Sequence, residues 1–209
     1  MTSPLRAALC VAVAFSLPGC VSLLPKTTPA QLYSLTVAAS PTNAAEISRG
    51  FNVQRLPTAF ASEAEGSQIL TVDGDQAAYI AAARWDAPAA QLFDEAETMA
   101  FDRASGPARL LRAGDSASGP VGLRLDVQSF EARYLGGPKA APTVVVSVRA
   151  LLIGTADHKV IADQVFESQR PAADDRVGAI VDGFDAATTD VLTRIVDWTG
   201  REGAAAKGG

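Results

Sequence analysis

Apolar residues recur at helical spacing in two stretches of the chain. The first begins near Pro88, which suits the first turn of a helix because no amide donor is needed there, and it stops at Ser105-Gly106-Pro107. The second follows Pro171 and ends at Gly200. The apolar positions are Leu92, Phe93, Ala96, Met99 and Ala100 in the first stretch, and Val177, Ile180, Val181, Phe184, Ala187, Val191, Leu192, Ile195 and Trp198 in the second. This spacing predicts two amphipathic helices, each burying one face.

The residues around these faces define the ends and outer surfaces of the helices. We expect Asp86 to accept hydrogen bonds from the first amides of the first helix, and Asp174 or Asp175 to cap the second. Gly178 and Gly183 each cost about 1 kcal/mol relative to alanine inside a helix, and close approach to a sheet would explain them. The remaining acidic residues of the first helix are Asp94, Glu95, Glu97 and Asp102. They are expected to form its solvated face rather than a metal site.

Alternation of apolar and polar residues predicts strands elsewhere. The predicted strands are 33–37, 51–56, 69–72, 76–82, 121–134, 144–153 and 160–166. The 76–82 segment is rich in alanine and could begin a helix instead, although Asp73-Gly74 before it favours a hairpin turn. A change of phase near Gln128-Ser129 predicts a bulge, and 59–67 is expected to be a surface loop. The last three strands indicate an antiparallel meander. The chain is therefore predicted to be α+β, with a mainly antiparallel sheet and two helices packed on one face.

The segment 144–153 is apolar at both parities, which is typical of a strand covered on both faces or of one face used in assembly. If Val144, Val146, Val148 and Leu152 face the helices, the other parity points away from them. That parity contains Val145, Leu151 and Ile153, placed around Ser147 and Arg149. An exposed apolar patch usually marks an interface. Val145, Leu151 and Ile153 are therefore candidate interface residues, unless loops or the amino-terminal tether cover this face.

The beginning of the chain has the organisation of an export signal. Arg6 supplies a positive charge, an apolar run from Ala7 to Leu17 follows, and Gly19 precedes Cys20. The sequence Leu17-Pro18-Gly19-Cys20 resembles the lipobox of bacterial lipoproteins, and that resemblance implies cleavage before Cys20, a diacylglycerol on its thiol and acylation of the new amino terminus, for example by palmitate. The alternative is an ordinary secretory signal that ends near a cysteine. We divide the chain into a signal peptide (1–19), a lipidated cysteine and tether (20–30), one domain (31–200) and a disordered tail (201–209).

The charge of the chain excludes some partners. The full chain has a formal net charge of −5, and loss of the leader, whose one charged residue is Arg6, makes it −6. A negative domain is a poor ligand for nucleic acid or for an anionic lipid surface. No later window has the roughly 18 apolar residues of a membrane-spanning helix. The expected link to the membrane is therefore the lipid on Cys20 alone.

Residues that carry common catalytic or metal chemistry are few. After cleavage the only cysteine is the lipidated Cys20, and the only histidine is His158, which lies in a predicted turn. Zinc sites usually need several histidine or cysteine ligands, and neither a nucleophile elbow nor a phosphate-binding loop is present. We expect no metal, no cofactor and no enzymatic activity; a lipid-anchored periplasmic hydrolase is the less favoured alternative.

The aromatic residues divide into two groups. Phe93 and Trp198 lie on the predicted apolar helix faces and are expected to seal the core. Tyr79 and Trp85 lie between predicted elements, where a large amphipathic ring suits contact with a partner as well as core packing. They join the candidate interface residues.

Several of these features occur in an order that resembles a known family. The features are Tyr33-x-Leu35 after the tether, Ile69 to Val72 before Asp73-Gly74, Tyr79 and Arg84-Trp85-x-x-Pro88 before a helix, a turn with Asp157, Val160 to Phe166, and a final helix with Phe184 and Asp197-Trp198. This order resembles the ABC-type transport auxiliary lipoprotein family, which includes the lipoprotein of the paraquat-inducible system. The resemblance extends from Tyr33 to Trp198 and carries no active site.

The resemblance implies a function. It implies a periplasm-facing component of an MCE-type ABC system that moves lipids between the inner and outer membranes, acting as a docking or structural subunit. The expected partners are the MCE-domain protein, the ABC transporter complex and the membrane, with a homo-oligomer as a further option. Val21 and Ser22 include no aspartate to suggest inner-membrane retention, so the outer membrane is favoured. A stand-alone structural envelope lipoprotein is the alternative.

Overall fold

The computed structural model describes residues 29–38, 50–112, 114–137 and 139–208. The predicted signal peptide, the lipobox with Cys20 and most of the tether lie outside these residues. Within them, none of the helices is long and apolar enough to cross a bilayer.

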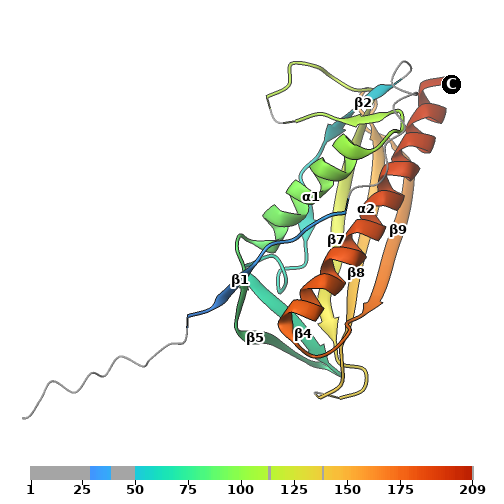
Figure 1. Ribbon diagram of the computed structural model, residues 1–209. Coiled ribbons are helices and arrows are strands. Elements are labelled where there is room, and N and C mark those ends of the chain that lie inside the picture. The colour runs from blue at the N-terminus through green and yellow to red at the C-terminus, as the bar shows by residue number, and fades with distance from the viewer. Residues whose placement is uncertain (1–28, 39–49, 113, 138, 209) are drawn as a thin grey trace, which may run out of the picture.

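The described chain forms one sheet with both helices on the same face (Figure 1). The strands are β1 (Gln31–Tyr33), β2 (Phe51–Arg55), β3 (Ala59–Phe60), β4 (Gln68–Asp73), β5 (Gln76–Trp85), β6 (Ala108–Leu110), β7 (Val121–Arg133), β8 (Thr143–Gly154) and β9 (Val160–Pro171), and the helices are α1 (Ala89–Arg103) and α2 (Val177–Gly208). The α+β class and the placement of both helices on one face are confirmed.

Strand β7 is the centre of the sheet. One of its edges pairs antiparallel with β8 along almost its whole length, and β8 pairs antiparallel with β9. Its other edge pairs in turn with β2, β3 and β4, which follow one another along β7 and all run parallel to it. Strands β1 and β6 add further parallel pairs.

The sheet is therefore mixed, and the prediction of a mainly antiparallel sheet was wrong. Parallel neighbours need a crossover between them, and α1 is part of that crossover. It carries the chain to the end of the sheet where β2 begins, so that β6 and β7 start there and run in the direction of β2. The alternation of side chains locates the strands, but this return path depends on contacts between distant residues.

The local features of the strands largely match the sequence pattern. The 76–82 segment is a strand, part of β5, and Asp73 pairs with Gln76 across the hairpin turn. The register of β7 against β8 shifts between Val127 and Ser129, where the bulge is predicted. The predicted surface loop at 59–67 differs, because it contains β3 and a buried alanine, Ala64.

Helix α2 packs directly on β8. The helix-facing side chains of β8, among them Val144, are fully buried. A Cβ atom built on Gly183 would lie 2.8 Å from Cγ2 of Val144, so this glycine permits the close approach. Nothing lies within 4 Å of a Cβ built on Gly178, and the packing does not explain that residue. A chain of aromatic rings from β3, β5, β7 and both helices fills the space beneath: Phe60, Trp85, Phe93, Phe130 and Phe184.

The helix beginnings are stabilised in different ways. Pro88 is the N-cap of α1 and offers no side-chain acceptor. The first amides of α1, those of Ala89 and Ala90, donate instead to the backbone carbonyls of Gly66 (3.0 Å) and Glu65 (3.2 Å). The predicted cap, Asp86, accepts from the Ser34 hydroxyl. Before α2, Oδ1 of Asp174 accepts from the Arg176 amide at 2.9 Å, one residue ahead of the first helical residue. This is a turn leading into the helix, and the predicted cap on the first helical amides is not among the hydrogen bonds of the described residues.

Helix α2 extends beyond the predicted end at Gly200. It reaches Gly208, so residues 201–208 are helical rather than a disordered tail. The cause is packing at Gly203: a Cβ atom there would lie 2.4 Å from Cζ of Phe51, which shows how closely the helix approaches β2. The alanines that follow, Ala204 to Ala206, have the highest helix propensity.

Residues 34–38, which we call the strap, run between the two helices (Figure 1). Leu35 and Val37 of the strap are buried in the core. The Thr36 amide donates to Oδ1 of Asp185 (2.9 Å) and the Ala38 amide to Oγ1 of Thr189 (3.1 Å), both on α2. The strap was predicted as part of a strand 33–37, but only Gln31–Tyr33 pairs in the sheet. The two hydrogen bonds and the two buried side chains attach the strap, which follows the tether, to the helix layer.

Candidate functional site

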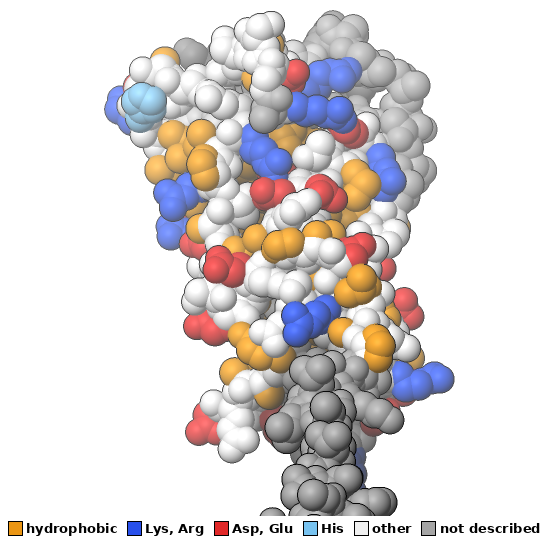
Figure 2. Space-filling view, turned by 90° about the vertical axis from the view of Figure 1, so that its left-hand side faces the viewer, with side chains coloured by type: hydrophobic (Ala, Val, Ile, Leu, Met, Phe, Trp, Pro, Cys, Tyr) orange, Lys and Arg blue, Asp and Glu red, His pale blue; other side chains and the backbone are white. Residues whose placement is uncertain are grey.

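The structure separates the two aromatic residues proposed for an interface. Trp85 is 2% exposed and packs edge-to-face on Phe184, with ring centroids 5.3 Å apart. It therefore belongs to the core and offers almost no surface to a partner. Tyr79 is 44% exposed, and its hydroxyl donates to the Glu63 carbonyl at 3.0 Å. Tyr79 lies on β5. On the side of the molecule seen in Figure 2, hydrophobic, acidic and basic side chains are interspersed.

The face of β8 turned away from the helices carries the other three predicted residues. Leu151 and Ile153 are half-buried, but Val145 is only 2% exposed. The expected exposure of Val145 was therefore wrong. Its cross-strand neighbours are Glu131 of β7 and Gln169 of β9, and directly opposed long side chains pack over a short valine.

Charged groups divide this free face of the sheet. The Arg149 guanidinium donates through Nε to Oδ1 of Asp163 at 2.9 Å, and Nη2 binds the second carboxylate oxygen. These hydrogen bonds hold the pKa of Asp163 below its ordinary value. Beside the pair, Val165 is 52% exposed. The face is therefore amphipathic and is not one continuous apolar patch.

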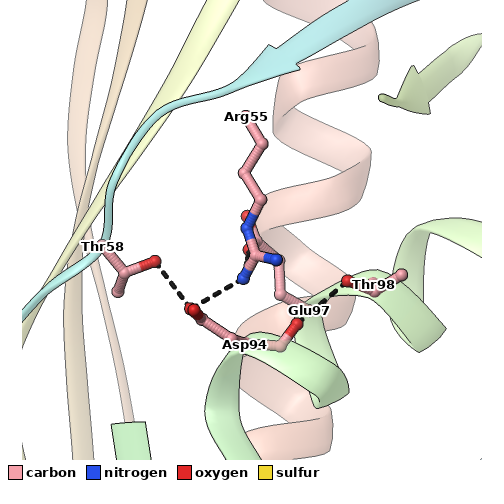
Figure 3. Close-up of polar contacts among 5 residues, drawn as sticks. All are labelled: Arg55, Thr58, Asp94, Glu97 and Thr98. Atoms are coloured by element: carbon pink, nitrogen blue, oxygen red, sulfur yellow. Dashed lines mark hydrogen bonds and ion pairs between the residues drawn. The ribbon is translucent and has the colours of Figure 1, made fainter. Parts of the chain in front are cut away.

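A cluster of charged residues lies between α1 and the end of β2 (Figure 3). Nη2 of Arg55 lies 2.7 Å from Oδ1 of Asp94 and 2.9 Å from Oε2 of Glu97. Thr58 donates to the same Asp94 oxygen at 2.8 Å. Glu97 is 1% exposed, so the prediction that it belongs to the solvated face of the helix was wrong. Asp94 remains partly exposed, with 40% of its side chain accessible.

Burial raises the pKa of Glu97 to about 7, although the nearby Arg55 charge lowers it. Removing a carboxylate from water costs more free energy here than one guanidinium returns. The cluster links α1 to the β2–β3 segment, and its acid is enclosed. Within the described residues, no group of three or more histidine, cysteine or acidic side chains could hold a metal ion. The geometry indicates a structural contact.

The sequence contains a signal for this cluster that the prediction overlooked. Phe51, Val53 and Arg55 share one parity of β2, and the first two are buried, so Arg55 points the same way. Glu97 follows the buried Ala96 and lies one turn after Phe93. One charged residue on the buried face of β2 and one of opposite charge on the buried face of α1 together indicate a buried ion pair.

A groove lies between the strap and the outer surface of α2. Its volume is about 650 Å³, and its lining includes Arg170 and the acidic residues Asp182, Asp185 and Asp190. Burial raises the pKa of Asp185 above its ordinary value, although the Thr36 amide opposes the shift. The predicted turn residue His158 lies far along the chain from this groove, exposed between β8 and β9.

Comparison with known proteins identifies one family. The family model described as "ABC-type transport auxiliary lipoprotein component" matches residues 33–196. Among curated proteins, none matches the chain significantly.

Solved structures share the fold. A Xanthomonas campestris protein is similar with a TM-score of 0.76 and 24% identity, covering 86% of this chain and 100% of its own. A hypothetical protein from Chlamydia trachomatis is similar with a TM-score of 0.50 and 12% identity, covering 75% of this chain and 99% of its own. At these identities the similarity shows the fold alone.

Proposed function

The chain belongs to the family of ABC-type transport auxiliary lipoproteins, and on that premise we propose that it is a lipid-anchored docking subunit of an MCE-type ABC system that moves lipids between the inner and outer membranes. The observation that carries the proposal is the extent of the family match, which begins in β1 and ends within α2. It therefore includes the strap, strands β2 to β9, helix α1 and the larger part of α2.

The anchor we propose is Cys20, in the outer membrane and facing the periplasm. The support is the lipobox-like sequence and the absence of aspartate at Val21 and Ser22. The segment from Cys20 to Pro29 spans about 30 Å when fully extended. The described domain would therefore stay close to the membrane surface.

A docking role rather than a catalytic one is supported by how the chain uses its reactive groups. The buried carboxylate of Glu97 is enclosed and paired with Arg55, and His158 lies in an exposed turn. Among the residues predicted for an interface, those with accessible surface are Tyr79, Leu151 and Ile153. We propose that these contribute to the docking surfaces.

Membrane fractionation and co-purification test the proposal. The wild-type chain should be in the outer-membrane fraction and should co-purify, after detergent extraction, with an MCE-domain protein of the same cell. Cys20→Ser should leave the membrane fraction or remain unprocessed, because a lipid anchor needs the thiol. Cys10→Ser, in the leader, is the matched control and should behave as wild type.

Two outcomes would contradict the proposal. A Cys20→Ser chain that is cleaved and still membrane-bound would show that the lipid is not the anchor. A wild-type chain that is anchored but never found with an MCE-domain protein would instead be a stand-alone structural lipoprotein of the envelope.

A further inference from the structure

Strand β9 forms an open edge of the sheet. Within the described residues it pairs with β8 alone (Figure 1). The Ala172 amide donates to the Pro142 carbonyl at 2.8 Å, next to a ladder in which Val144 is opposite Arg170. Backbone groups of an edge strand alternate between the ladder and the outside. Even-numbered residues of β9 therefore bond to β8, and the amides and carbonyls of odd-numbered residues such as Val165 point outward.

The middle of this edge lacks several of the features that protect edge strands against added strands. Proteins shield edges with proline, lysine, bulges or very short strands. In β9 the irregular register near Ala162 and the proline at Pro171 occur only at the two ends. Between them the strand is regular, contains no lysine or proline, and exposes 52% of Val165. The middle of β9 can accept a further strand by main-chain hydrogen bonding.

Arg194 of α2 occupies one outward position on this edge. Its Nη2 donates to the Glu167 carbonyl at 2.5 Å, where the amide of an added strand would donate. The same guanidinium carbon lies 5.8 Å from the centroid of the Phe166 ring. Arg194 thus reaches from the helix across the ring to the backbone of the edge strand.

A small groove runs beside the edge at this point. Its volume is about 200 Å³, and it is lined by Gln164, Val165, Phe166, Arg194, Asp197 and Arg201. Arg201 makes no ion pair with any residue that the structure describes. The one acid in the lining is Asp197, and Asp190 of the same helix lies 3.5 Å from both Arg170 and Arg194. The helix side of the edge therefore presents more positive than negative groups.

We propose that the β9 edge binds an extended acidic segment of a partner protein as an added strand. The amide of that strand replaces Arg194 on the Glu167 carbonyl. The released guanidinium and Arg201 then bind an acidic side chain of the segment, as charge-assisted hydrogen bonds favour. On the opposite face, Asp163 is held by Arg149, and Glu167 accepts from the neutral Gln169, so the acidic side chains of β9 lie on the face away from Arg194 and Arg201. The proposal does not depend on the transport function.

A second copy of the chain fits this edge less well. In an antiparallel β9–β9 pair centred on Val165, Asp163 of each copy would lie opposite Glu167 of the other. Like charges at directly opposed positions are unfavourable. The charge pattern therefore favours an acidic segment from a different protein.

Two matched peptides test the proposal on the full-length chain in detergent. Each is a fluorescent ten-residue peptide of alternating valine and threonine, with a central aspartate in one and a central lysine in the other. The aspartate peptide should bind about ten-fold more tightly than the lysine peptide, with a preference that salt weakens. Its binding should protect the outward amides of Val165 and Gln169 from hydrogen exchange.

Variants of the chain locate the site. Val165→Pro removes one outward amide and leaves the β8 ladder intact, so it should abolish peptide binding without changing the circular dichroism spectrum. Should that variant fail to fold, Val165→Lys, which protects edges in natural proteins, should give the same loss. Arg201→Glu should remove the preference for aspartate. Arg109→Glu, an exposed arginine on β6, is the control and should change nothing.

Three results would overturn the proposal. The first is equal binding of the two peptides, and the second is binding of neither. The third is self-association of the wild-type chain that Val165→Pro abolishes, seen by light scattering, because the occupant would then be a second copy.

Discussion

Glu97 is almost completely enclosed beneath α1, and Arg55 is the cation that faces it. The pKa of its carboxyl is raised from 4.5 to about 7, so the folded chain holds this proton more tightly than the unfolded chain does. A raised carboxyl pKa adds stability below the unfolded value, and that stability is lost as the pH rises toward the folded value. This residue therefore makes the domain less stable at pH 8 than at pH 5.

Glu97→Gln should remove this pH dependence. The amide keeps the size of the side chain and carries no charge, and Arg55 retains Asp94 as a partner. The wild-type free energy of unfolding should contain a contribution that falls by about 3 kcal/mol between pH 5 and pH 8, and the variant should lose that contribution. Urea unfolding at the two pH values measures it. The exposed Glu95→Gln is the control, and equal slopes for Glu97→Gln and wild type would contradict the assignment.

For single residues, the sequence pattern predicts which side chains are buried. It predicts less well which side chains they contact. The helical spacing places Phe93 and Trp198 in the core, where the structure has them. The pairing of Glu97 with Arg55 depends on how α1 crosses β2. No local pattern specifies that crossing, because it follows from the packing of distant segments.

The elements themselves are specified mainly by side-chain periodicity. The alternation at Val144, Val146 and Val148 gives the correct inward face of β8, and the phase change gives the β7 bulge. The end of α2 was not predictable from glycine alone, since Gly200, the predicted end, lies within the helix against Pro107, and Gly203 lies against Phe51. Strand direction was also not predictable, because the path of α1 decides that β6 and β7 run parallel to β2.

Two glycines of α2 give a matched test of its packing. Gly183→Ala should destabilise the domain by about 1–2 kcal/mol, because the new methyl group would lie 2.8 Å from Cγ2 of Val144, a stiff β-branched side chain. Gly178→Ala meets nothing within 4 Å and should stabilise the helix by up to about 1 kcal/mol. Urea unfolding at fixed pH compares them. Equal changes in the free energy of unfolding for the two substitutions would show that helix propensity, and not contact with β8, determines the effect of alanine at these positions.

On the scale of the whole molecule, the sheet has one face covered by helices and one free face that combines buried and accessible positions. Val145 is closed off by its neighbours, whereas Leu151 on the same strand is accessible. Both residues have the same parity in the sequence, so the alternation alone does not separate them; their cross-strand neighbours differ, Glu131 and Gln169 for Val145 and Arg124 and Asp163 for Leu151.

Glutamate substitutions should distinguish these two positions. Val145→Glu should lower the free energy of unfolding by several kcal/mol, because it buries an unpaired charge. Leu151→Glu should leave the fold intact and, on the proposed docking role, reduce co-purification with the MCE-domain protein, since charges are depleted from interface cores. Circular dichroism and pull-down are the measurements. A folded Leu151→Glu chain that retains its partner would remove this residue from the docking surface.

The contacts of the strap connect the beginning of the domain with its last helix, and this affects the order in which the chain can fold. The amides of the strap bind Asp185 and Thr189, which lie 149 and 151 positions later in the sequence. An exported chain crosses the membrane amino end first, so on the proposed anchoring Cys20 receives its lipid before these acceptors arrive. Contacts of such long range form slowly. Lipid attachment would therefore act on an open chain, and the arrival of α2 would be the event that locks the anchored end to the domain.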